Sequence, residues 1–348
     1  MKSRNSSVEL LRIICMILII FHHYSLHGIL ENYEFSYINF NWQMLYVQII
    51  SCGGRFACIV FMLITGYYSI SAKTNYKRVV KLIIEMFFYS WVISAIIYGL
   101  KISPINIKQL INNAFPIFGG NWFCVAYIGV CLIMPFINPM LNSLHQDTYK
   151  KLVIVLFVMS VIIPTFFFES PYFSSGFGYF IVAYITGGYI RKYSLDKLKS
   201  RVHGWKILLV SSVILLIGSV IVIDLLGMFL KSDVIIRNAC YFRELNKLPA
   251  VGIALSMFMI AIERPVFNNV LINRAAASTL GIYLIHDNNL LQSVLWEKWF
   301  SGISYIETYI IVIHSIISVI IVFLACLAID QIRILIFDKT IYRLFDKI

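Results

Sequence analysis

The sequence predicts an all-α, polytopic membrane helical bundle with about ten transmembrane helices. Hydrophobic residues make up 60% of the 348 residues and charged residues 13%, whereas soluble domains average about 45–50% and about 25%. The mean hydropathy is +0.82. Apolar runs of about 20 residues, long enough for a helix to cross a bilayer, lie near residues 7–27, 44–70, 80–100, 120–141, 152–168, 176–190, 207–227, 247–263, 276–296 and 307–330.

Three of these runs need comment. The first follows Lys2 and Arg4 as a signal peptide would, but no small-residue cleavage site comes after it, so we expect an uncleaved helix. The sixth, 176–190, is short, and the ninth, 276–296, could re-enter the membrane rather than cross it. No linker, repeat or low-complexity stretch divides the chain, which predicts one integral membrane domain spanning residues 1–348.

The positive charges indicate how the chain is oriented. Most of the 29 Lys and Arg residues fall in alternate loops, above all between Arg191 and Lys206 and in the C-terminal tail. Cytoplasmic loops carry such an excess, so both termini are expected in the cytoplasm. The net charge of +12 then reflects topology and attraction to membrane lipid. We see no nucleic-acid-binding module and expect no nucleic acid partner.

Two ionisable residues stand out in the first span. Arg12 and His23 are eleven positions apart, which is close to three turns at about 100° per residue, so they share one helix face about 16 Å apart along the axis. Charged groups at such depth are expensive and usually functional. A neutral imidazole can act as a general base. His22 points to a different face, and His27 is expected at the outer interface.

Other uses of these histidines remain open. His23 and His27 have a spacing that can hold zinc, but no third acidic or thiol ligand lies near them in the sequence. A haem could be held between His23 and His286. The seven cysteines lie mostly in apolar runs without a CxxC pattern and are expected to pack. A transporter for glycans or small substrates is a further alternative, because intramembrane Arg and His also mark transport paths.

Basic residues also mark the second and third spans. Arg55 lies inside apolar surroundings, where it could pair with an acid or face a water-filled cavity. Gly53, Gly54 and Gly66 permit close helix approach. Residues 77–81 form a basic cluster that could simply fix topology or could bind a phosphorylated ligand.

A polar cluster closes the ninth predicted span. His286 and Asp287 follow an apolar run and precede two asparagines. This could be an ordinary interfacial helix end, or a group that orients a base or binds sugar hydroxyls. Neighbouring residues on a helix do not face one another, so Asp287 is expected to serve a group on another helix.

Several motifs, in this order and spacing, resemble the acyltransferase-3 family over nearly the whole chain. The first helix resembles the family's Arg…His motif through Glu9-Leu10-Leu11-Arg12 and His23. Phe61 to Tyr68 is similar to its FF-x-x-SGY segment, with Thr65 where serine is usual. The cytoplasmic RxxR motif is matched by Arg78-Val79-Val80-Lys81, which ends in lysine. Further similar segments are Asn121-Trp122-Phe123, Pro135-Phe136 and Gly281 to His286.

The resemblance implies a membrane O-acyltransferase that moves an acyl group, usually acetyl, from cytoplasmic acyl-CoA to a hydroxyl of an extracytoplasmic cell-surface or lipid-linked glycan. It implies acetyl-CoA or another acyl-CoA as co-substrate, no permanently bound cofactor or metal, and a place in the cell membrane. The residues it assigns are His23 as general base, Arg12 orienting the acyl donor or its phosphate arm, and Arg78 and Lys81 holding the CoA phosphates. Beyond the resemblance, we expect Arg55 to bind the donor as well, and His286, Asp287 and Trp122 to bind the acceptor.

Overall fold

The computed structural model describes residues 5–72, 76–104, 106–119, 121–167, 176–194 and 202–338, and within them it contains helices and no strand. Eight helices are long and apolar enough to cross a membrane: Ser6–Leu30, Trp42–Ser69, Lys77–Gly99, Trp122–Ser143, Gln146–Phe166, Val202–Phe229, Asp233–Glu263 and Ile310–Phe337. The predicted class, a polytopic helical bundle, is confirmed. Lys2, Arg4 and the tail beyond residue 338, used to infer cytoplasmic termini, lie outside the described residues.

The crossing helices are built from several shorter elements. In chain order the elements are α1 (Ser6–Ser25), η1 (Leu26–Leu30), α2 (Trp42–Ser51), α3 (Gly53–Ser69), α4 (Lys77–Gly99), α5 (Ile107–Ala114), α6 (Pro116–Gly119), α7 (Trp122–Ser143), α8 (Gln146–Phe157), η2 (Val158–Ile162), α9 (Ile163–Phe166), α10 (Gly176–Tyr189), η3 (Ile190–Ser194), α12 (Val202–Phe229), α13 (Asp233–Arg237), η5 (Tyr241–Arg243), α14 (Leu248–Glu263), α15 (Val270–Ala277), α16 (Thr279–His286), α17 (Leu291–Ser293), η6 (Val294–Trp299), η7 (Ile303–Tyr305), α18 (Ile310–Arg333) and η8 (Ile334–Asp338).

The sixth and ninth predicted spans are not single long α-helices. The sixth forms α10 (Gly176–Tyr189), which has 14 residues, and η3 begins at Ile190. Residues 276–296 are broken into the end of α15, then α16, α17 and η6, and α16 ends at His286 with Asp287 as its C-cap. Irregular backbone at membrane depth is tolerated where it is buried in protein or lines a cavity. The break at Asp287 is such a place, because Asp287 is buried and lines a cavity.

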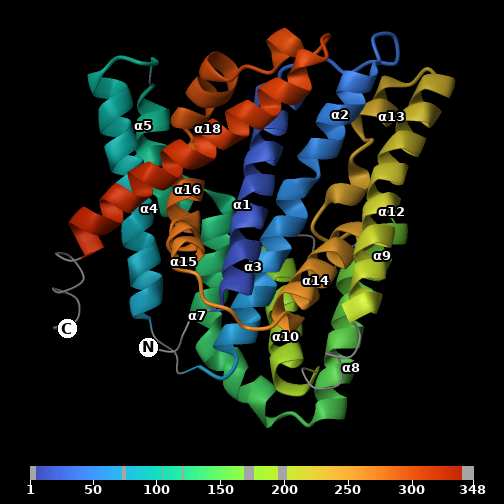
Figure 1. The fold of residues 1–348 in the computed structure, drawn as a ribbon, viewed down its shortest axis with the longest axis vertical. Helices are drawn as coiled ribbons and strands as arrows, with labels where there is room; N and C mark the ends of the chain where they lie inside the picture. The colour runs from blue at the N-terminus through green and yellow to red at the C-terminus, as the bar shows by residue number, and fades with distance from the viewer. Residues whose placement is uncertain are drawn as a thin grey trace.

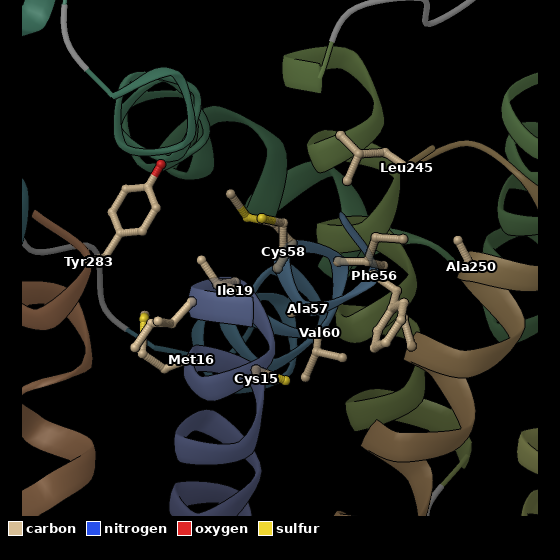
Figure 2. Packing of buried hydrophobic residues seen from close by; sticks show 14 of the residues in the cluster. Cys15, Met16, Ile19, Phe56, Ala57, Cys58, Val60, Leu245, Ala250 and Tyr283 are labelled. Carbon is tan, nitrogen blue, oxygen red and sulfur yellow. The ribbon is translucent and has the colours of Figure 1, made fainter. Parts of the chain in front are cut away.

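Helices α1 and α3 form the centre of the bundle (Figure 1). Helix α1 contacts α2, α14, α15 and α18 besides α3, and α3 also contacts α10 and α14. Figure 2 shows Cys15, Met16 and Ile19 of α1 close to Ala57 and Val60 of α3 in the buried core. The first helix therefore has protein on several sides, which is where costly ionisable side chains can be kept away from lipid.

Helix α12 lies at the outside of the bundle, as the yellow ribbon of Figure 1 shows. Its exposed side chains are large and apolar: Ile207, Val210, Ile214, Leu215, Val222, Leu225 and Phe229. A continuous exposed apolar surface of this kind marks a membrane contact. The hydropathy of its sequence is therefore explained by lipid rather than by protein packing.

Two glycines allow α3 and α10 to touch through their backbones. A Cβ added at Gly66 would lie 2.0 Å from the carbonyl oxygen of Tyr184, and one added at Gly187 would lie 2.3 Å from that of Leu63. Backbone atoms cannot turn aside as a side chain can. The close approach expected at Gly66 is confirmed, and small residues at such crossings are typical of membrane helix pairs.

Gly66→Ala should destabilise the protein by about 1–3 kcal/mol, the usual range for overpacking a tight core, because its methyl group would force α3 and α10 apart. The thermal midpoint of the purified protein in detergent measures this. Gly218→Ala is the control, since a Cβ at Gly218 on α12 meets nothing within 4 Å. A Gly66→Ala midpoint equal to that of the control would contradict the packing argument.

Candidate active site

Two cavities lie on opposite stretches of α1. The inner cavity, of about 470 Å³, takes its polar lining chiefly from Arg12, Arg78, Lys81, Glu85 and Arg333. The outer cavity, of about 270 Å³, is lined by polar and aromatic side chains that include His22, His23, His27, Arg55, Asn121, Trp122, Asp287 and Gln292. Arg12 therefore belongs to one cavity and His23 to the other, as their separation of about three turns on one face leads one to expect.

His23 makes a direct contact with a second histidine. Its side chain is almost buried, with 6% of the residue exposed, and its Nδ1 lies 3.0 Å from Nε2 of His286. His286 is completely buried, and its own Nδ1 lies 2.6 Å from the carbonyl oxygen of Ile282, one turn earlier in α16. The two imidazoles thus form a short chain of hydrogen bonds that ends on a backbone carbonyl.

This chain determines which ring nitrogen carries each proton. A carbonyl oxygen only accepts hydrogen bonds, so Nδ1 of His286 must be the protonated nitrogen. In a neutral, buried His286 the other nitrogen, Nε2, is then an acceptor, and Nδ1 of His23 must donate to it. A neutral His23 consequently has its lone pair on Nε2. This is the tautomer that a general base acting through Nε2 requires.

Asp287 places a carboxylate beside the same imidazole. Its Oδ1 lies 3.5 Å from Nδ1 of His23 on α1, so it faces another helix, as the helix spacing indicated. Asn121 holds the residue by donating from Nδ2 to the backbone oxygen of Asp287 at 2.7 Å and to its Oδ2 at 2.9 Å. A carboxylate fixed here would stabilise His23 when the imidazole becomes positively charged.

The neighbouring histidines have other partners. His22 contacts the carbonyl oxygen of Ser51 through Nδ1, and its ring packs so close to Gly54 that a Cβ there would lie 2.5 Å from Cγ of His22. His27 pairs with Glu31 at 2.8 Å near the outer end of the helix. His22 therefore ties α1 to the α2–α3 junction.

The metal and haem alternatives can be compared with this geometry. The ligand atoms of His23, His27 and Asp287 lie within 4.8 Å of one another, so the third ligand missing from the local sequence is supplied by a distant segment. However, Nδ1 of His23 is bonded to His286 and Nδ1 of His27 to Glu31. A haem between His23 and His286 does not fit, because their nitrogens are in direct hydrogen-bonding contact at 3.0 Å.

Three cations of the inner cavity, Arg12, Lys81 and Arg333, are each paired with an acid. Arg12 lies 3.6 Å from Glu9, and Lys81 lies 3.8 Å from Glu85 at the expected spacing of four residues. Glu85 is shared with Arg333 of α18, which lies 3.3 Å from it and 2.8 Å from Asp330. Arg333 was missed because its sequence position suggested an ordinary charge at the end of the last span.

Two residues lie in other places than the sequence suggested. Arg55 lines the outer cavity, with its Nε 3.6 Å from Oε2 of Glu244 and its guanidinium carbon 5.3 Å from the centre of the Trp122 ring, whereas Arg78 and Lys81 line the inner cavity. His286 is completely buried behind His23 and does not line the outer cavity. Trp122 and Asp287 do line the outer cavity.

The family model described as an acyltransferase domain, acyltransferase-3, matches residues 5–330. The chain belongs to the acyltransferase-3 family. Curated proteins and solved structures gave no significant match. The protein is therefore a multi-pass membrane acyltransferase.

Proposed function

We propose that this acyltransferase moves an acetyl group from cytoplasmic acetyl-CoA to a hydroxyl of a cell-envelope polysaccharide or lipid-linked glycan outside the plasma membrane. The observation that carries the proposal is the arrangement along α1. A cavity with cationic groups lies at one end, an imidazole with a defined tautomer lies at the other, and Ile19 and Tyr283 line both cavities. A donor and an acceptor entering from opposite sides would meet there.

The inner cavity suits an anionic donor. Arg78 is exposed at its mouth on α4, with Lys81 one turn further and Arg12 deeper on α1. Arginine forks match phosphate oxygens and lysine supplies a compact charge. The deeper lining is mostly apolar and includes Met16, Phe61 and Leu280. In the proposal the CoA phosphates bind near the mouth, and the pantetheine arm extends along α1 with its thioester toward His23.

The outer cavity suits a sugar hydroxyl. Trp122 offers an aromatic face, and Arg55 and Gln292 offer hydrogen-bond donors. Because Arg55 lines this cavity, it is assigned to the acceptor in this proposal. A cavity of about 270 Å³ would hold one part of a glycan while the remainder stays outside the protein.

The reaction follows from the tautomer of His23. As the sugar oxygen forms a bond with the thioester carbon, Nε2 of His23 takes the hydroxyl proton. Nδ1 stays hydrogen bonded to His286, and the Asp287 carboxylate stabilises the new positive charge. When the C–S bond breaks, CoA leaves as a thiolate and the proton returns from His23 to its sulfur. General base catalysis of this kind contributes about 10²–10⁴-fold.

His23→Ala should lower glycan acetylation by at least about 10²-fold, because no base remains to take the hydroxyl proton. Envelope glycan from cells carrying the variant is compared by NMR and mass spectrometry with glycan from wild-type cells and from cells lacking the protein. His203→Ala is the control, since His203 is exposed on α12 outside both cavities. Normal acetylation by His23→Ala at wild-type protein levels would remove His23 from the mechanism.

Arg78→Ala combined with Lys81→Ala should raise the KM for acetyl-CoA by about tenfold or more, since hydrogen bonds to charged groups contribute about 1.5–3 kcal/mol each. Steady-state kinetics of the purified protein in detergent measure this. The control removes Lys150 and Lys151, two exposed lysines of α8 outside the inner cavity. Equal KM values for the two double variants would contradict the donor site.

A further inference from the structure

Tyr283 has a buried hydroxyl that makes no hydrogen bond of ordinary geometry within the part of the chain that the structure describes, where the Asp287 carboxylate is its polar neighbour. Only 3% of the residue is exposed. Its ring lies between Phe123, with centroids 5.6 Å apart, and the two site histidines, at 6.2 Å from His23 and 6.0 Å from His286. Figure 2 shows the hydroxyl directed away from the ribbon of α16 and toward that of α7.

Tyr283 also lies on the boundary between the two cavities. Among the described residues, only Ile19 and Tyr283 line both the inner and the outer cavity. Ile19 has no polar side-chain atom, so the Tyr283 hydroxyl is the one polar side-chain group on this shared boundary. Any carbonyl group that passes from a donor in the inner cavity to an acceptor in the outer cavity must cross beside it.

A buried hydroxyl without a well-formed hydrogen bond lowers stability, because it has lost its hydrogen bonds to water and gained no equivalent. Phenylalanine would fill the same space without that loss. Tyr283 lines the boundary between the two cavities, so a bound ligand with an acceptor oxygen could accept a hydrogen bond from its hydroxyl. In the proposed reaction the acceptor oxygen that reaches this boundary is the thioester carbonyl.

We propose that the Tyr283 hydroxyl is a catalytic hydrogen-bond donor that stabilises the oxyanion formed during acyl transfer. This inference rests on the function proposed above. When the sugar oxygen bonds to the carbonyl carbon, the π electron pair of the C=O bond moves to the carbonyl oxygen, and the Tyr283 hydroxyl donates to that oxygen. As the C–S bond breaks, the pair returns to re-form the carbonyl of the ester. Tyr283 keeps its proton throughout, and the sugar proton goes to His23 as before.

The test is Tyr283→Phe in the purified full-length protein, with acetyl-CoA and a glycan acceptor. Loss of one oxyanion donor typically lowers kcat by about 10²–10³-fold. We expect a fall of that order, with the KM for acetyl-CoA within about twofold of wild type, because the hydroxyl acts on the transition state and not on the phosphates. The thermal midpoint should stay equal or rise, since an unpaired buried hydroxyl is removed.

Tyr149→Phe is the matched control. The Tyr149 hydroxyl is buried in a separate cluster and donates to the carbonyl oxygen of Ile185 at 2.9 Å, outside both cavities. This variant should lose thermal stability and keep its kcat. Removing a catalytic hydroxyl lowers kcat and leaves the thermal midpoint equal or higher. Removing a structural hydroxyl lowers the thermal midpoint and leaves kcat unchanged.

The outcomes separate this inference from the proposed function. If wild type acetylates the glycan and His23→Ala does not, but Tyr283→Phe keeps a kcat within about threefold of wild type, the oxyanion role is wrong and the acyl transfer stands. A Tyr283→Phe variant that raises the KM and keeps kcat also overturns it, because the hydroxyl would then bind the donor in its ground state. If wild type itself transfers no acetyl group, the proposed function fails first.

Discussion

The structure of the site depends on one chain of hydrogen bonds from the carbonyl oxygen of Ile282 through His286 to His23. The carbonyl can only accept, so it sets the proton on His286, and His286 in turn sets the proton on His23. The orientation of the proposed base is thus determined by the backbone of α16. Groups that orient a catalytic imidazole in this way hold both its ring position and its tautomer.

Several features of the fold serve this chain. Helix α16 ends at His286, which turns Asp287 out of the helix and toward α1, where it is held by Asn121. The polar groups that this break exposes are acceptable because protein and the outer cavity surround them rather than lipid. Gly54 allows His22 to reach the α2–α3 junction, so α1 is fixed there as well as at α16. The proposed base therefore lies on a helix that is held by more than one neighbour.

The sequence could predict what is local and periodic. Hydropathy identified the eight long crossing helices, and helical spacing put Arg12 and His23 on one face. It could not predict contacts between distant segments. The bond between His23 and His286 joins residues 263 positions apart, and the side of the bundle to which Arg55 belongs depends on how α3 packs against α7. Tyr283 looked like one more aromatic residue in an apolar run, because a hydroxyl without a partner is visible only after packing is known.

The proposed reaction requires donor and acceptor to reach His23 from opposite sides of the membrane. The decisive measurement uses the wild-type protein reconstituted in one orientation in sealed vesicles, with glycan acceptor on the outer-cavity side and radiolabelled acetyl-CoA supplied to one side only. We expect label on the glycan when acetyl-CoA is on the side of Arg78 and Lys81, and almost none when it is on the acceptor side. Equal labelling from both sides, or labelling only from the acceptor side, would contradict it.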